Sequence, residues 1–342
     1  MRPTARSILR SLEAADKRHL FLTGARGVGK STLFSALCTG PCVTTFAVKG
    51  EGVYLKDGET VVQVGLYDGS LPGTENKMRP IPEGFAEGIR ALERLARSES
   101  PWVGIDEVGY LETEAYQHAF WRLLEQKRVL AVVRKQDTPF LSGLLARKDA
   151  LVVDLDRKDT GCVIMASGLG RRFGGNKLMA DLGGKPVVQW ALDAAQGVFS
   201  KTVVVTRHEA VAALCEKRGV SAVLHDLPHR SDTVRLGLEA LGDVGHCLFL
   251  PGDQPFVTKQ SLFALMLAAQ ASGDIWRLGG ASPAIFPKWA FEELKALPQG
   301  KGGNVLILKY GAKSLPAETE WELRDIDTPQ DLACFCAGIC CN

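Results

Sequence analysis

The chain has 342 residues, of which 46% are hydrophobic and 23% are charged, and its formal net charge at pH 7 is +2. This composition excludes a disordered chain, and the near-neutral charge excludes binding to nucleic acid or to membranes through a basic surface. No run reaches the about 18 apolar residues of a membrane helix, and the N-terminus lacks the apolar core of a signal peptide, so we expect a cytoplasmic protein. At roughly 100–200 residues per domain, the length predicts two domains.

Short apolar runs alternate with helical patterns along the whole chain, which predicts an α/β protein with mostly parallel strands. An amphipathic helix is expected within residues 1–18. Strands are predicted at the apolar runs 19–23, 43–48, 61–65, 102–106, 129–133, 150–154, 162–166, 202–206, 221–224 and 246–250. Helices are predicted at 84–97, 115–127, 187–197, 231–241 and 259–271.

A charged, apolar-poor segment near residues 156–160 separates two halves of the chain, each of which opens with a strand and a glycine-rich loop. We therefore predict one domain over residues 1–157 and a second over residues 158–342. The two loops differ in pattern, so the halves are not read as a repeat.

The first loop, GARGVGKST at residues 24–32, fits the P-loop pattern G-x-x-x-x-G-K-[ST] and lies between a strand and a helix. Backbone N–H groups in such a loop point at phosphate oxygens, and the helix N-terminus adds partial positive charge. The lysine reaches the β- and γ-phosphates, and the following hydroxyl binds Mg²⁺. The predicted nucleotide-binding residues are Gly24, Gly27, Gly29, Lys30, Ser31 and Thr32.

An acidic pair ends the strand in WVGIDE, residues 102–107. Asp106 is predicted to hold the metal ion together with Ser31, and Glu107 to orient an attacking water as a catalytic base. Loop and acidic pair together predict a site for nucleoside triphosphates and Mg²⁺.

Four segments in order, GARGVGKSTL, IPEGFAEGIRAL, WVGIDEVGYLE and VLAVVRKQDTPFLSGL, resemble the small bacterial and archaeal P-loop nucleoside-triphosphatase family over residues 18–155. The resemblance implies hydrolysis of nucleoside triphosphates with broad tolerance of the base. Partner proteins of molybdopterin–guanine dinucleotide synthesis are also small P-loop units, so an accessory role stays open for this domain.

A second glycine-rich loop, VIMASGLGRRFGGNKL at residues 163–178, follows a buried strand and contains Arg172 and Lys177. Glycine lets backbone approach a triphosphate, and the cations neutralise charge on a departing pyrophosphate. Asp253 lies past the next strand, in LFLPGDQP, where a carboxylate can hold Mg²⁺ against phosphates. Asp325 and Asp327 are expected at the end of a short strand, before a helix that starts at Thr328-Pro329.

The three segments ASGLGRRFGGNK, GDQP and DIDTPQD resemble the MobA-like nucleotidyltransferases, most closely the molybdenum cofactor cytidylyltransferases, over residues 161–334. The resemblance implies a Rossmann-like domain in which Arg172, Lys177 and Asp253 are catalytic, Asp253 binds Mg²⁺ and Asp327 lies beside it as a further metal ligand. It implies nucleotide contacts at Ala166, Ser167, Gly168 and Gly170. It also assigns residues 279–286 to the acceptor and residues 231–238 to the pocket wall.

This chain departs from that family pattern at three places. Ser167 replaces the second alanine of the first segment, Ser282 precedes Pro283 where a larger polar residue is common, and residues 300–306 lack an acid and an arginine. These departures affect the identity of the acceptor substrate more than the type of reaction. The opening at residues 166–168 favours CTP over GTP.

The function predicted from both halves is transfer of CMP from CTP to a pterin-type molybdenum cofactor, with release of pyrophosphate, fused to a domain that hydrolyses a nucleoside triphosphate. A molybdenum hydroxylase is the expected client, and neither nucleic acid nor membrane is an expected partner. Two alternatives stay open: transfer to another phosphorylated acceptor such as a sugar or alditol phosphate, and a nucleotide-binding accessory protein that delivers cofactor without catalysis.

Histidines and cysteines are expected to be structural. His208, His225, His229 and His246 are isolated, although His225 and His229 lie just before the predicted pocket wall. Five cysteines are scattered and read as reduced thiols, and four crowd the last nine residues without a zinc-binding spacing.

Overall fold

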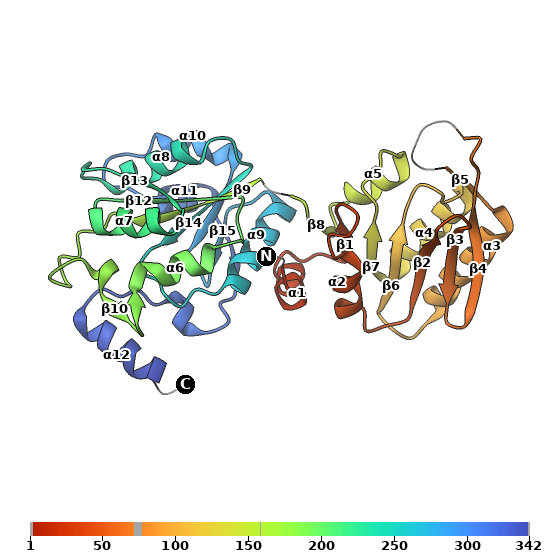
Figure 1. The fold of residues 1–342 in the computed structure, drawn as a ribbon, viewed down its shortest axis with the longest axis horizontal. Coiled ribbons are helices and arrows are strands. Elements are labelled where there is room, and N and C mark those ends of the chain that lie inside the picture. Colours follow the sequence, from red (N-terminus) through yellow and green to blue (C-terminus); the bar gives the residue numbers. More distant parts are fainter. Residues whose placement is uncertain (1–2, 72–76, 158, 341–342) are drawn as a thin grey trace. The chain divides into compact units, whose positions relative to one another are not determined.

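The computed structural model describes residues 3–71, 77–157 and 159–340, with side chains up to residue 335, and the chain divides into two units (Figure 1). One unit is Asp16–Arg157, and the other combines the described residues from 159 onward with the N-terminal segment up to Ala15. The described residues up to Ala15, which were predicted to belong to the first domain, therefore belong to the other unit. The chain changes unit a second time after Arg157.

The N-terminal segment joins the second unit because helix α1 (Ala5–Ala14) packs along helix α9 (Lys259–Ser272). Ile8 of α1 is fully buried in this contact face. Ser11 is also buried, and its hydroxyl donates to the carbonyl of Ala264 over 2.9 Å. The chain thus leaves this unit after one helix and returns to it after residue 157.

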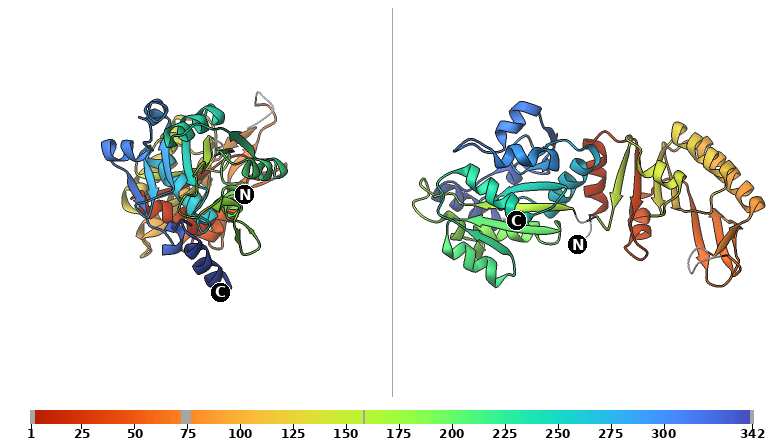
Figure 2. Two further views of the ribbon diagram at one scale, coloured as in Figure 1. Left: turned by 90° about the vertical axis from the view of Figure 1, so that its left-hand side faces the viewer. Right: turned by 90° about the horizontal axis from the view of Figure 1, so that it is seen from above.

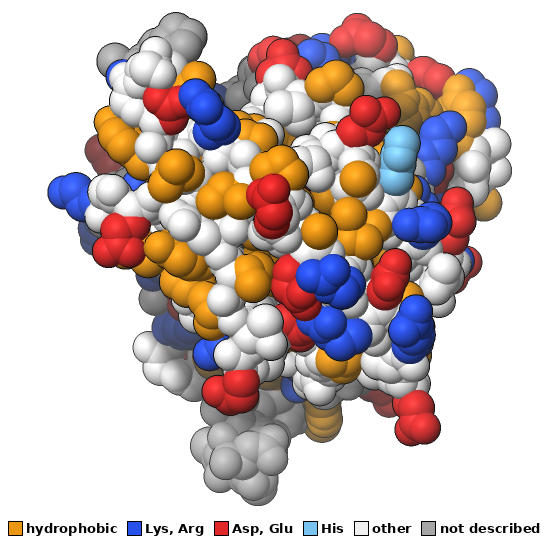
Figure 3. Space-filling view, turned by 90° about the vertical axis from the view of Figure 1, so that its right-hand side faces the viewer, with side chains coloured by type: hydrophobic (Ala, Val, Ile, Leu, Met, Phe, Trp, Pro, Cys, Tyr) orange, Lys and Arg blue, Asp and Glu red, His pale blue; other side chains and the backbone are white. Residues whose placement is uncertain are grey.

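Unit Asp16–Arg157 is built on one eight-stranded sheet in the order β5-β4-β3-β2-β6-β7-β1-β8. The strands are β1 His19–Thr23, β2 Cys42–Val48, β3 Gly52–Asp57, β4 Thr60–Tyr67, β5 Met78–Pro80, β6 Trp102–Val108, β7 Arg128–Val133 and β8 Ala150–Asp154. The helices are α2 Lys30–Leu37, α3 Pro82–Arg97, α4 Glu114–Gln126 and α5 Pro139–Leu145. Figure 3 shows a face on which hydrophobic side chains gather in groups between charged ones.

Four of the seven strand pairings in this sheet are parallel and three are antiparallel. Strands β2, β6, β7, β1 and β8 run parallel, as predicted, whereas β2 to β5 form an antiparallel meander. Only three residues join β2 to β3, a connection too short for the crossover that parallel neighbours need. The expectation of mostly parallel strands is therefore wrong for residues 52–80, and the unit is mixed α/β.

Helix α3 lies close against the meander because two of its positions are glycine. A Cβ added at Gly84 would overlap the carbonyl oxygen of Gln63 in β4, and one added at Gly88 would lie 3.2 Å from a methyl carbon of Leu55 in β3. Both glycines are on one face of α3, four residues apart.

We expect Gly84→Ala to lower the free energy of unfolding of this unit by about 1–3 kcal/mol, because backbone cannot move aside cheaply. Gly143→Ala in α5 is the matched control, since its added Cβ would lie 3.6 Å from Trp121, an ordinary contact. Alanine is the better helix former, so this control is expected to lose no stability. Denaturant unfolding followed by circular dichroism measures both, and equal midpoints would contradict the packing argument.

The second unit contains a seven-stranded sheet in the order β13-β12-β9-β14-β16-β15-β17. Its strands are β9 Thr160–Ala166, β12 Lys201–Thr206, β13 Ser221–Leu224, β14 His246–Pro251, β15 Trp276–Leu278, β16 Ala284–Pro287 and β17 Lys313–Leu315, and β10 Asp181–Leu182 pairs with β11 Lys185–Pro186. Its further helices are α6 Val187–Ala195, α7 Glu209–Lys217, α8 Arg230–Leu241, α10 Phe291–Lys295, α11 Asn304–Tyr310 and α12 Pro329–Cys340, with short 3₁₀ turns η1 Lys177–Met179, η2 Lys288–Ala290 and η3 Glu320–Leu323.

The strand order of this sheet predicts a ligand-binding crevice at the carboxyl ends of its parallel strands. Strands β13, β12, β9 and β14 are parallel, and the chain moves from β9 to β12 on one side but later to β14 on the other. Helices α8 and α10 lie over one face and α6 and α7 over the other (Figures 1 and 2). In such sheets ligands bind beyond the carboxyl ends of the strands where the order reverses, which here means the ends of β9 and β14.

Along the part of the chain that the structure describes, no helix has both the length and the apolar character needed to cross a membrane.

Candidate functional site

The loop between β1 and α2 has a backbone that requires glycine. Gly24, Gly27 and Gly29 have φ values of 136°, 76° and 96°, in the region that other residues avoid. Gly29 is the residue before α2, so the loop delivers the chain into the helix N-terminus with several N–H groups free of helical partners. This is the geometry in which a loop surrounds an anion.

Lys30, Ser31 and Asp106 lie at the mouth of this loop. The Lys30 ammonium donates to the carbonyls of Gly24 and Ala25, both at 2.8 Å. The Ser31 hydroxyl bonds to the Asp106 carboxylate, and burial, reinforced by the charge of Glu107, raises the pKa of Asp106. The Oδ1 atom of Asp106 is buried and has no hydrogen-bond partner among the described residues.

Glu107 has an unusual backbone and an arginine partner. Its φ of 79° is left-handed, which is uncommon for a residue with a side chain and occurs often at functional sites. Its carboxylate forms an ion pair with Arg134, the first residue after β7. Arg134 was not predicted as a site residue, although β6 and β7 are parallel neighbours, so residues after their carboxyl ends must meet.

A cavity of about 850 Å³ joins these residues to the meander. Of the residues predicted for the first site, Gly24, Lys30, Ser31, Asp106 and Glu107 line it. Gly27, Gly29 and Thr32 are not among its lining residues: the first two shape the loop, and Thr32 lies on the exposed side of α2.

In the second unit, four predicted residues form one charged cluster at the carboxyl ends of β9 and β14. The Lys177 ammonium lies 2.6 Å from the carboxylate of Asp253 and 2.9 Å from that of Asp327. Arg172 reaches Asp327 over 2.9 Å. Burial acts to lower the pKa of Lys177, but the two carboxylates outweigh it and raise the pKa, so the amine is charged at neutral pH.

The segment that carries Asp327 is extended loop, not the short strand predicted. Ile326 is fully buried and donates its N–H to the carbonyl of Asp253 over 3.0 Å, which holds the two aspartates together. Asp331 accepts from the backbone N–H groups of Asp327 and Thr328 at the start of α12, where the helix start was predicted. A buried anchor and a helix cap therefore fix the position of Asp327.

The glycine loop after β9 folds tightly over this cluster. Gly170 has a φ of 59°, and a Cβ there would overlap the carbonyl oxygen of Gly175. Ser167 and Gly168 line the same cavity as Gly170. Ala166 does not, because it is the buried last residue of β9.

At the other end of this cavity, three histidines that were expected to be structural and two arginines that were not predicted either line it or contact its lining residues. The Ser167 hydroxyl is 2.8 Å from Nε2 of His225, and Nε2 of His208 is 2.8 Å from the carbonyl oxygen of Gly168. Arg207 and Arg230 line the cavity there, with His229. A signal was present, since these residues follow β12 and β13 or begin α8 at the same edge of the sheet.

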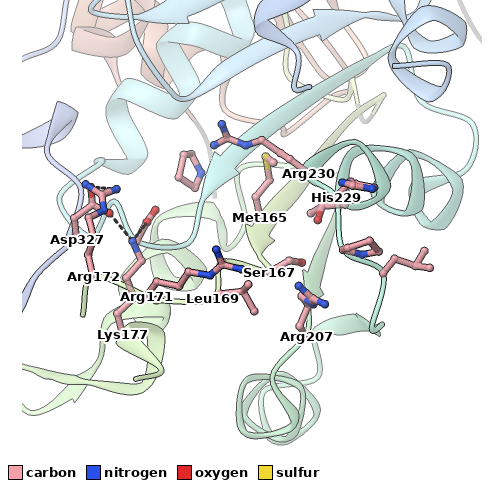
Figure 4. A pocket seen from close by; sticks show the side chains of 17 residues that line it. Met165, Ser167, Leu169, Arg171, Arg172, Lys177, Arg207, His229, Arg230 and Asp327 are labelled. Atoms are coloured by element: carbon pink, nitrogen blue, oxygen red, sulfur yellow. Dashed lines mark hydrogen bonds and ion pairs between the residues drawn. The ribbon is translucent and has the colours of Figure 1, made fainter. Parts of the chain in front are cut away.

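The cavity has a volume of about 440 Å³ and a positive lining. Its charged lining residues are Arg171, Arg172, Lys177, Arg207, Arg230, Asp253 and Asp327. Figure 4 shows Arg172, Lys177 and Asp327 gathered at one end and Arg207 toward the other. An extended ligand with several negative charges fits this distribution better than a neutral one. The predicted acceptor segment 279–286, which forms the turn after β15 and the start of β16, is not among the lining residues.

Neither site forms a complete metal cage. Among the described residues, no group of three or more histidines, cysteines, aspartates or glutamates is placed to hold a metal ion. The oxygen donors present, Ser31 with Asp106 and Asp253 with Asp327, suit Mg²⁺, which takes one or two protein ligands and completes its shell with phosphate and water.

Fold and site thus define the second unit as an α/β domain with a positively lined cavity at the switch point of its sheet. Residues 162–314 match the family model described as a MobA-like NTP transferase domain, so this part of the chain is a domain of that kind. The resemblance read from the three sequence segments is confirmed at that level.

Curated relatives match over shorter stretches. A 3-deoxy-manno-octulosonate cytidylyltransferase of Bdellovibrio bacteriovorus is 35% identical over 94 residues, which are 26% of this chain and 37% of that protein. A bifunctional protein GlmU of Gluconacetobacter diazotrophicus is 33% identical over 132 residues, 37% of this chain and 28% of that protein. The chain thus spans well under half the length of these relatives.

Similar solved structures cover about half of the chain. A nucleotidyl transferase from Methanothermobacter thermautotroptrophicus aligns with a TM-score of 0.48 at 22% identity, covering 54% of this chain and 100% of its own. Molybdopterin-guanine dinucleotide biosynthesis protein A from Archaeoglobus fulgidus aligns with a TM-score of 0.44 at 24% identity, covering 53% and 98%.

Proposed function

We propose that the second unit transfers CMP from CTP to a phosphorylated pterin-type acceptor and releases pyrophosphate. The observation that carries the proposal is the Lys177 ammonium, mostly buried and held between Asp253 and Asp327 under a glycine loop at the switch point of the sheet. A positive charge fixed in this way stabilises a bound triphosphate, and the protein does not have to reorganise during the reaction. The match to MobA-like NTP transferases supports the reaction class.

In the proposed reaction a phosphate oxygen of the acceptor attacks the α-phosphorus of CTP. A new P–O bond forms there, the bond between the α-phosphorus and the bridging oxygen breaks, and pyrophosphate leaves. A phosphate nucleophile is already ionised, so no general base is needed, and Lys177 and Arg172 act by neutralising the triphosphate.

Magnesium fits the carboxylates of Asp253 and Asp327 and would supply further positive charge to the phosphates. Asp253 and Asp327 have a second role in the protein itself, since they keep Lys177 charged and aimed into the cavity. The contacts proposed for the nucleotide lie at the backbone of Ser167, Gly168 and Gly170, which line the cavity, with Ala166 supporting them from β9.

The pterin acceptor and a molybdenum hydroxylase client rest on the motif resemblance. A second acceptor class, sugar or alditol phosphates, is favoured by one observation. Residues 300–306 lack the acid and arginine of the family pattern, and Gly302 of this segment packs against the cavity residue Arg230.

For unit Asp16–Arg157 we propose hydrolysis of a nucleoside triphosphate. Loop amides and Lys30 would bind the phosphates, while Ser31 and the unpartnered oxygen of Asp106 would hold Mg²⁺. Glu107 would orient the attacking water. Arg134, paired with Glu107, is added to the predicted set as a residue that positions the base.

The test is pyrophosphate release by the full-length Lys30→Ala chain, so that hydrolysis at the first site does not consume the nucleotide. CTP, GTP, ATP and UTP are supplied in turn with Mg²⁺ and a molybdopterin-type cofactor. Release with CTP alone supports the proposal. Release with GTP alone would show that GTP, and not CTP, is the nucleotide substrate. No release with any nucleotide overturns the pterin acceptor and moves the assay to sugar and alditol phosphates.

A further inference from the structure

The cavity of unit Asp16–Arg157 has two chemically different ends. One end is the phosphate loop with Lys30, Asp106 and Glu107. The other end is lined by apolar and aromatic side chains from the meander, α3 and α4, including Phe46, Leu55, Val64, Phe85, Tyr110 and Tyr116. Leu55, Val64, Phe85 and Tyr116 are each at most 4% exposed, so this end has a firm, buried floor.

The apolar end lies beyond the terminal phosphate. In a P-loop the lysine and the hydroxyl mark the β- and γ-phosphates, and the acid after the neighbouring strand marks the γ end. From Glu107 the chain runs directly to Tyr110 and Glu112, which line the apolar end. The nucleoside of a bound nucleotide leaves the phosphates on the opposite side, so it does not account for this space. The proposed hydrolysis needs only a water there.

Glu112 supplies a carboxylate to the lining of this cavity, close to Tyr116. Its Oε1 atom accepts from the backbone N–H of Gly109 over 2.7 Å, which closes the turn after β6. Its Oε2 atom is buried and has no hydrogen-bond partner among the described residues. A turn needs only one of the two oxygens, and a buried acceptor without a partner is costly, so the second oxygen is free for a ligand.

We propose that the apolar end binds a planar heteroaromatic molecule that donates an N–H hydrogen bond to Oε2 of Glu112. Flat rings suit a wall in which Phe85 and Tyr116 already meet edge to face, with centroids 5.3 Å apart. The volume, about 850 Å³, is in the upper part of the roughly 300–1,000 Å³ range of ligand cavities, which leaves room for a second molecule beside the phosphates. The proposal depends on the proposed nucleotide site in one respect, which is that this site defines the end of the cavity that holds the phosphates.

The probe is 2-aminobenzimidazole, a planar bicyclic ring with N–H donors, titrated calorimetrically into the full-length chain without nucleotide. The comparison probe is 1-methylbenzimidazole, which has a similar shape and no N–H. Glu112→Gln is the decisive variant, because its amide oxygen can still accept from Gly109 while its NH₂ group replaces the free acceptor with a donor. Glu114→Gln, an exposed change two residues away, is the matched control.

We expect the aminated probe to bind, and Glu112→Gln to weaken it roughly tenfold to a hundredfold, as for loss of a buried hydrogen-bond pair. Glu114→Gln is expected to leave its affinity unchanged, and the methylated probe to bind more weakly and without dependence on residue 112. Absence of binding at millimolar probe, or equal affinity in a Glu112→Gln chain with an unchanged melting curve, overturns the proposal. Because no nucleotide is present, failure of NTP hydrolysis leaves this readout untouched.

Discussion

Lys177→Ala is expected to lower the turnover number for pyrophosphate release by about 10²–10³-fold, the range seen when one preorganised charge-stabilising group is removed. The loss should be in kcat as well as in affinity for CTP, because the variant leaves Asp253 and Asp327 without the ammonium between them, and the incoming phosphates lose that positive charge. Initial rates of pyrophosphate release, measured over a range of CTP concentrations, separate the effect on kcat from the effect on affinity for CTP.

Lys288→Ala is the matched control for Lys177, since Lys288 makes an exposed ion pair with Asp243 away from the cavity lining. It should retain the full rate. A Lys177→Ala chain that is folded and works within a factor of about three of the parent would remove this lysine from the proposed chemistry.

Glu107→Gln is expected to lower nucleoside-triphosphate hydrolysis by about 10²–10⁴-fold, as expected for loss of a general base, while nucleotide binding persists. The amide keeps the size of the side chain but can neither take a proton nor pair ionically with Arg134. Phosphate release reports the rate, and a fluorescent nucleotide reports binding.

The same variant should leave pyrophosphate release at the second unit unchanged, which separates the two activities in one chain. Glu99→Gln, an exposed change in the same unit, serves as control. If Glu107→Gln still hydrolyses at the parental rate, the water is oriented by another group and the ion pair with Arg134 is structural.

Local patterns predicted the elements that position both sites. The strand bounds 19–23 and 150–154 agree with the structure, and the start of α12 follows from the motif at Pro329, whereas α2 begins at Lys30, within the loop segment 24–32. Strands β3, β5, β15, β16 and β17 were missed because they are short or interrupted, and their pairing depends on neighbours that are distant in sequence.

The site residues likewise divide into those that local motifs predicted and those that depend on distant parts of the chain. Motif residues such as Lys177, Asp253 and Asp327 come together, although 74 residues separate the two aspartates, because each follows a strand or a buried anchor at one edge of the sheet. Arg134 lies within the segment VLAVVRKQDTPFLSGL, which assigned it no role, and His225 lies in no motif. Only the strand order places them beside Glu107 and Ser167, and strand order is a tertiary property.

The packing of α1 on α9 has a consequence for biosynthesis. On the ribosome α1 emerges before α9, which is not complete until residue 272. At about 5–20 residues per second, the nascent helix waits on the order of ten seconds or more, while the whole of Asp16–Arg157 is made and begins to fold. Ser7 and Ser11 reduce the apolar surface exposed during that wait, and the bond from Ser11 to Ala264 forms only when α9 arrives. Helix α1 thus reaches its final position long after it has been translated.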